Sequence, residues 1–131
     1  MKGKMPGVTL IADWDPKPGF KLGSKDIEGR QTYLGSQVWR NPRLEIREYD
    51  IPTPGPEEVL LEVKACGICG SDVHMAQAEQ DGYIFYPGLT GFPCILGHEL
   101  SGVVVEAGKN ARDKRTNKPF KGGEAVTTEE M

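Results

Sequence analysis

The period of the apolar residues limits the fold most strongly, because these residues recur at nearly alternate positions in short runs. An alternate-residue period is typical of β-strands, whereas an amphipathic helix repeats its apolar positions every three to four residues over a longer stretch. The proline-rich segment 51–58 is expected to be a loop, because proline lacks the amide proton that a strand ladder needs. Alternation therefore predicts strands over 8–13, 43–50 and 58–66, and the β-branched apolar run over 99–108 predicts another. A further strand is expected over 123–128, so the fold is expected to be mainly β.

The segments between these runs predict little regular structure. One short helix is expected through 71–78, capped by Ser71 or Asp72, with Ser71 and His74 three positions apart on one face. Residues 14–42 are rich in Gly, Pro, Lys and Asp, which indicates an irregular excursion or a long hairpin. The segment 108–123 holds six basic residues and one acid, and we interpret it as a solvated loop rather than an anion-binding patch.

Length and composition narrow the class of protein. A chain of 131 residues is expected to form a single domain, residues 1–131, with a core that needs no disulfides. A net charge of -3 offers no general attraction to nucleic acid or to an anionic membrane, and no apolar run has the length of a membrane span. Three cysteines, an odd number, disfavour a secreted disulfide framework, so we expect a cytoplasmic protein.

The residues with the most chemistry are gathered in two short segments, CGICGSDVH (66–74) and CILGHE (94–99). They contain all three cysteines and both histidines of the chain. Thiolate and imidazole together are typical ligands of zinc, so this clustering predicts a metal site. The alternatives for the paired cysteines are a redox couple, a structural zinc site and a catalytic zinc site.

Spacing and neighbours distinguish these alternatives only in part. A redox C-x-x-C needs its first cysteine at the start of a substantial helix, and here the helix signal begins after Cys69. A structural site through Cys66, Cys69, Cys94 and His98 has acceptable ligand spacing and stays open. Against it, Cys66 is the last residue of an expected strand, where we expect it to be a buried, small apolar residue. A closed site also has no use for the neighbouring Ser, Asp, His and Glu.

Three segments, VKACGICGSDVH, PCILGHELSGVVVEAG and GEAV, resemble the N-terminal catalytic domain of the zinc-containing medium-chain alcohol and polyol dehydrogenases. The leader before residue 47 and the RTNKPF segment look most like a polyol branch of this family, which includes scyllo-inosose dehydrogenase. The resemblance implies a GroES-like, partly open β-barrel with short helices, which agrees with the strand-rich pattern.

The resemblance also implies the role of each site residue. Cys69, His98 and Glu99 match the protein ligands of the catalytic zinc, and Cys66 and Cys94 match no ligand. Among the neighbours, Ser71 matches the hydroxyl that takes the substrate proton, His74 the outer member of the relay to solvent, and Asp72 the carboxylate that hydrogen-bonds the zinc-bound histidine.

The family reaction further implies a nicotinamide cofactor, NAD or NADP, because zinc has no redox chemistry of its own. The substrate is expected to be a small polyol or secondary alcohol. No G-x-G-x-x-G follows an expected strand, so a C-terminal cofactor domain is a missing partner, and we expect the chain to be the N-terminal part of a longer, homo-oligomeric enzyme. A non-enzymatic zinc module and a GroES-like interaction domain remain as alternatives.

Overall fold

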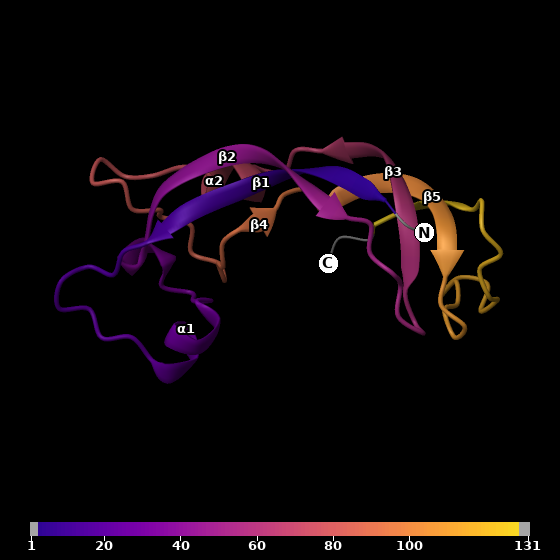
Figure 1. The fold of residues 1–131 in the computed structure, drawn as a ribbon, viewed down its shortest axis with the longest axis horizontal. Coiled ribbons are helices and arrows are strands. Elements are labelled where there is room, and N and C mark those ends of the chain that lie inside the picture. The colour runs from indigo at the N-terminus through magenta and orange to yellow at the C-terminus, as the bar shows by residue number, and fades with distance from the viewer. Residues whose placement is uncertain (1–2, 129–131) are drawn as a thin grey trace. The chain divides into compact units, whose positions relative to one another are not determined.

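The structure, a computed structural model, describes residues 3–128 and is mainly β with short helices and open sheets, as the sequence pattern predicts. No helix within residues 3–128 combines the length and the apolar character needed to cross a membrane. Figure 1 labels most of the elements. In chain order they are β1 (Lys4–Trp14), α1 (Ser24–Gly29), the 3-10 helix η1 (Gly35–Gln37), β2 (Trp39–Asp50), β3 (Val59–Gly67), α2 (Gly70–Met75), β4 (Cys94–Ile95), β5 (Glu99–Ala107) and β6 (Ala125–Thr127).

The described residues divide into two compact units, and each is considered by itself. The first unit holds residues 3–5, 48–68 and 97–128, and the second holds residues 6–47 and 69–96. The expectation that residues 1–131 form one zinc-binding catalytic domain stays a prediction.

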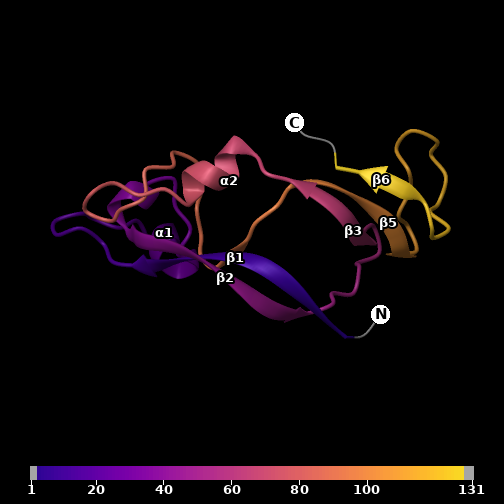
Figure 2. The same ribbon diagram turned by 90° about the horizontal axis from the view of Figure 1, so that it is seen from above.

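A three-stranded antiparallel sheet in the order β3-β5-β6 organises the first unit. Figure 2 shows β6 beside β5, which is the central strand. Two irregularities interrupt the β3–β5 register, between Leu60 and Leu61 and between Val63 and Ala65. Beyond the second, the pairing continues to Gly67 opposite Glu99.

The turn after β5 packs closely against the proline-rich loop. Gly108 donates its backbone N–H to the carbonyl of Glu58 at 2.8 Å, and Asn110 donates to the carbonyl of Pro56 at 2.7 Å. A Cβ at Gly108 would lie 2.1 Å from the carbonyl oxygen of Gly55, which is backbone that cannot move aside. Only glycine therefore fits at this position, and segment 51–58 is a loop, as its prolines predict.

The sheet β2-β1-β4 lies largely in the second unit. Two register pairs join β1 to β4, Thr9 with Ile95 and Leu10 with Cys94. We expected a half-buried strand over 8–13, but Thr9 and Leu10 are both completely buried, although neighbouring strand residues point to opposite faces. The expectation was wrong for this part of β1, where two consecutive residues, and so both faces of the strand, are covered.

Aromatic packing forms the core of the second unit. Buried Trp39 makes edge-to-face contacts with Trp14 and with Phe92, each with ring centroids 4.9 Å apart. Val38 and Ile84 are completely buried in the same cluster. The isolated aromatic residues between positions 14 and 42 thus include core residues that no strand-period pattern indicates.

The segment between β1 and β2 is a long hairpin connection with its own short elements. The backbone N–H of Asp15 donates to Val38 at 2.7 Å, and that of Lys17 donates to Gln37 at 2.8 Å, which closes its base. Helix α1 and the 3-10 helix η1 lie within it. The hairpin interpretation was correct, and the regular turns inside it were not predicted.

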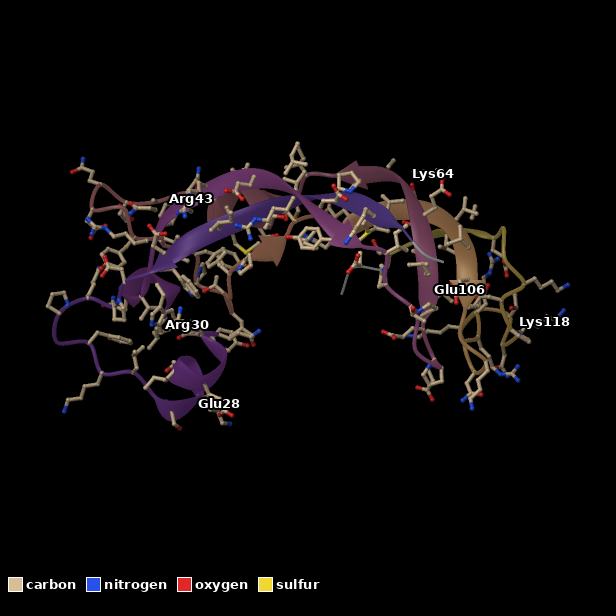
Figure 3. All side chains as sticks on the ribbon, viewed as in Figure 1. Glu28, Arg30, Arg43, Lys64, Glu106 and Lys118 are labelled. Atoms are coloured by element: carbon tan, nitrogen blue, oxygen red, sulfur yellow. The ribbon has the colours of Figure 1, made fainter. Side chains whose placement is uncertain are left out.

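Two further expectations about exposure have different outcomes. Strand β2 leaves Leu44 56% and Ile46 78% exposed, so the prediction that 43–50 is half buried through these residues was wrong. All six basic residues of segment 108–123 are exposed, in agreement with a solvated loop, and Figure 3 shows Lys118 pointing away from the strands.

Candidate metal centre

Cys69 is the residue immediately before helix α2. Its backbone is extended, with φ -87° and ψ 155°, and its N–H donates to Oδ2 of Asp72 at 3.0 Å. Asp72 is the third residue of the helix, where a carboxylate can reach back to the residue that caps it. We predicted Ser71 or Asp72 as the cap, and this was wrong. The helix starts at Gly70, so Cys69 is the cap, and the Asp72 side chain accepts its hydrogen bond from within the first turn.

The position of α2 bears on the redox interpretation. The helix starts at Gly70, so Cys66 lies in strand β3 and not at a helix start. The helix dipole that activates the first cysteine of a redox C-x-x-C is thus not available to Cys66 from α2. All three cysteines are free thiols. Cys66 is exposed, so the expectation that it is buried was wrong: Ala65 and Gly67 beside it in β3 are exposed as well.

Cys94 and Asp72 both lie in the second unit, where the charge of Asp72 acts on the thiol of Cys94. Burial raises the pKa of the Cys94 thiol, and the negative charge of Asp72 raises it further. A raised thiol pKa favours the protonated form, whereas a zinc ligand must be a thiolate. Both effects favour the protonated thiol of Cys94 in the metal-free chain.

The two residues predicted to move a proton are both on α2. Ser71 is partly buried and His74 is exposed. Nδ1 of His74 lies 3.2 Å from Oε1 of Gln77, one turn further along the chain. When the Gln77 oxygen accepts from Nδ1–H, Nε2 of His74 is left as the proton acceptor. Gln77 was not identified from the sequence, although its i, i+3 spacing from His74 was visible.

His98 and its neighbour Gly97 precede strand β5 in the first unit. Gly97 has φ +107°, a conformation that favours glycine, and a Cβ there would lie 2.8 Å from Sγ of Cys66. The carbonyl of His98 accepts a hydrogen bond of 2.8 Å from the hydroxyl of Thr128, and the His98 side chain is exposed. Both ends of this short segment are thereby constrained.

Glu99 begins β5 and lies opposite Gly67. A Cβ at Gly67 would lie only 3.1 Å from Oε2 of Glu99, so the Glu99 side chain occupies the space beside Gly67. Glu99 and Gly67 line an open surface hollow of about 480 Å³ within the first unit, together with Thr127 and Thr128. The carboxylate is thus partly buried at a place that solutes can reach.

The predicted site residues come from both units. Cys69, Ser71, Asp72 and His74 belong to the second unit, and His98 and Glu99 belong to the first. Within its own unit each group is close in sequence and in structure.

These strands and motifs match a known family. The family model described as "Alcohol dehydrogenase GroES-like domain" matches residues 55–131, more than half of the chain. The chain therefore belongs to the alcohol dehydrogenase GroES-like domain family, and the GroES-like fold class expected from the motifs is confirmed.

Several individual proteins are similar to this chain. The chain is 62% identical to Scyllo-inosose 3-dehydrogenase of Thermotoga maritima over 130 residues, which cover 97% of this chain and 32% of that protein. It is 45% identical to Sorbitol dehydrogenase of Ovis aries over 69 residues, or 53% of this chain and 18% of the relative. A solved structure from Thermotoga maritima, provisionally assigned as an alcohol dehydrogenase, superposes with a TM-score of 0.81 at 61% identity, covering 92% of this chain and 31% of the other. The chain thus spans about a third of the first relative's length.

Proposed function

We propose that this chain is the zinc-binding catalytic domain of an NAD(P)-dependent dehydrogenase that oxidises a polyol or secondary alcohol to a ketone. The observation that carries the proposal is the β3–β5 register, which sets Glu99 opposite Gly67. The proposed zinc ligands are Cys69, His98 and Glu99.

Chain connectivity and the β3–β5 register together limit how far apart the three proposed ligands can lie. Cys69 follows Gly67 by two residues, and two residues of extended chain span at most roughly 7 Å. His98 is bonded directly to Glu99, which pairs with Gly67. The donor set of one thiolate, one imidazole and one carboxylate suits a catalytic zinc, which binds three protein ligands and leaves one position open.

Zinc would supply Lewis acidity, which makes a hydroxyl group of the substrate easier to deprotonate. Ser71 then accepts the substrate proton on its hydroxyl oxygen as it passes its own proton to His74. His74 is exposed and can release that proton to solvent. Gln77 supports this step, because its hydrogen bond to Nδ1 leaves Nε2 of His74 as the acceptor.

The names of the relatives support a polyol substrate, since both Scyllo-inosose 3-dehydrogenase and Sorbitol dehydrogenase are similar to this chain. The hydride acceptor is NAD or NADP, which we expect to be held by residues that correspond to the other two thirds of Scyllo-inosose 3-dehydrogenase. A cytoplasmic, homo-oligomeric enzyme is part of the same proposal.

Zinc binding by single cysteine variants tests the ligand set. The purified chain is loaded with zinc, dialysed and analysed for metal by mass spectrometry. Wild type is expected to hold one zinc per chain, Cys69→Ser to lose it, and Cys66→Ser and Cys94→Ser to keep it. The Cys66→Ser variant is the matched control, because it removes a thiol three residues away.

Two results would contradict the proposal. A wild-type chain that binds no zinc would remove its chemical basis. Equal loss of zinc in Cys66→Ser, Cys69→Ser and Cys94→Ser would instead support the closed structural site, and with it a non-enzymatic zinc module.

A further inference from the structure

We propose that Thr128 is a positioning residue for the ligand pair His98 and Glu99, an inference that rests on the proposed zinc site. Thr128 follows strand β6, and neither its sequence context nor the resemblance assigns it a role. Its hydroxyl bridges the two backbone groups that flank Glu99.

The hydrogen bonds of Thr128 define this bridge. Its Oγ1 donates to the carbonyl of His98 at 2.8 Å and accepts from the N–H of Leu100 at 3.1 Å. A second carbonyl, that of Leu100, lies 3.4 Å from Oγ1, but a hydroxyl has one proton and the His98 contact is much shorter. The backbone N–H of Thr128 also donates to the Leu100 carbonyl at 3.0 Å.

The two hydrogen bonds of the Thr128 hydroxyl restrain the backbone of His98 and Glu99 on the side that faces β6. The groups at 98 and 100 stand immediately before and after Glu99, so the hydroxyl limits rotation of the chain on both sides of that residue. On the other strand, Gly67 leaves room for the Glu99 carboxylate. Partners that orient a metal ligand typically change metal affinity about 10- to 100-fold when removed.

Neighbouring Thr127 provides a matched control. Its hydroxyl donates to the Leu100 carbonyl at 3.1 Å, which lies on the far side of Glu99 from His98. It lines the same hollow as Thr128. Removing either hydroxyl deletes a hydrogen bond to β5, whereas the Thr128 hydroxyl is the one that connects to the backbone on both sides of Glu99.

The test measures the zinc dissociation constant by competition with a chromophoric chelator. Thr128→Val, which keeps the side-chain shape, is expected to weaken zinc binding by about tenfold or more. Thr128→Ser keeps the hydroxyl and should bind as wild type does, as should Thr127→Val. Among these variants, only Thr128→Val should change the absorption spectrum of the cobalt-loaded protein. In the metal-free protein, hydrogen exchange at the Leu100 amide should become faster in Thr128→Val.

Each outcome bears on a different claim. Wild-type affinity in Thr128→Val, or an equal loss in Thr127→Val, would overturn the positioning role while leaving the zinc site in place. Failure of wild type to bind zinc would overturn the proposed function and this inference together. Thr128→Ala, which removes the hydroxyl and the methyl group, repeats the test if Thr128→Val does not fold.

Discussion

Gly97 carries two separate constraints just before the ligand pair. Its φ of +107° is strained for any residue with a Cβ, and a Cβ would also come within 2.8 Å of the Cys66 sulfur. Gly122 has φ +95°, and a Cβ added there would meet nothing within 4 Å, so it carries only the first constraint. A comparison of Gly97 with Gly122 therefore distinguishes the cost of backbone strain from the cost of the contact with Cys66.

Gly97→Ala is expected to lower the free energy of unfolding by more than Gly122→Ala does. Backbone strain costs on the order of 1–3 kcal/mol in both variants, and overpacking adds about 1–3 kcal/mol at Gly97 alone. Adding Cys66→Ala removes the sulfur and should recover the second part of the loss. Urea unfolding measures all four proteins; equal losses in the two single variants would show that the Cys66 contact is easily relieved.

The Cys94 thiol should titrate above its ordinary pKa of 9.0, because burial and then the charge of Asp72 disfavour the thiolate. The rate of alkylation by iodoacetamide against pH, followed by mass spectrometry, should therefore rise at higher pH than for an unperturbed cysteine. Asp72→Asn should move this profile to lower pH, and Glu79→Gln, an equal change of charge, should not. Because the unfolded thiol loses its proton first, this group favours unfolding as the pH rises above its ordinary pKa.

An unmoved profile in Asp72→Asn would mean that burial alone sets the pKa of Cys94.

At the scale of the elements, helices α1 and α2 each depend on an aspartate three residues after the cap. Asp72 accepts from the N–H of Cys69 at 3.0 Å, and Asp26 accepts from the N–H of Gly23 at the same distance before α1. Asp72 is buried, with 8% of its surface exposed, whereas Asp26 is only partly buried. The same hydrogen bond therefore occurs in two environments.

Asp72→Ala is expected to lower the free energy of unfolding by about 1–2 kcal/mol, and Asp26→Ala by about 0.5 kcal/mol. The difference arises because the N–H left by Asp72 is less accessible to water. Asp72→Asn retains an oxygen acceptor and should recover part of the loss. Thermal and urea unfolding measure the four proteins, and an equal effect at both positions would show that burial does not strengthen this cap.

At the scale of the whole molecule, the 131 residues alone should show no hydride transfer to NAD or NADP, even when loaded with zinc. They contain no G-x-G-x-x-G motif for a dinucleotide, and losing the positioning of a second reactant can cost roughly 7 to 11 kcal/mol of the barrier. Absorbance at the nicotinamide band, with a panel of polyols, measures the reaction. Turnover near that of an intact dehydrogenase would place the cofactor site within this chain, contrary to the proposal.

The sequence by itself determined the strands and the chemical groups. Alternation of apolar residues predicted β3, and a β-branched apolar run predicted β5, each within one or two residues. The C-x-x-C and G-H-E motifs identified the family. These signals are local, because a strand's period and a motif's spacing are properties of neighbouring residues. The two-residue strand β4 and the turns in 15–38 were missed, since neither is long enough to show a period.

Tertiary structure alone decided which strand faces are covered and which backbone groups meet. The alternation in β2 places Leu44 and Ile46 on one face but cannot show that this face is exposed. In the same way, the position of Cys66 in β3 could not show that its side chain is exposed. The contact of Thr128 with His98 joins residues 30 positions apart through the β5–β6 register. Covering a face and setting a register both depend on distant segments of the chain, whose pairing is a property of the folded sheet and not of any short stretch of sequence.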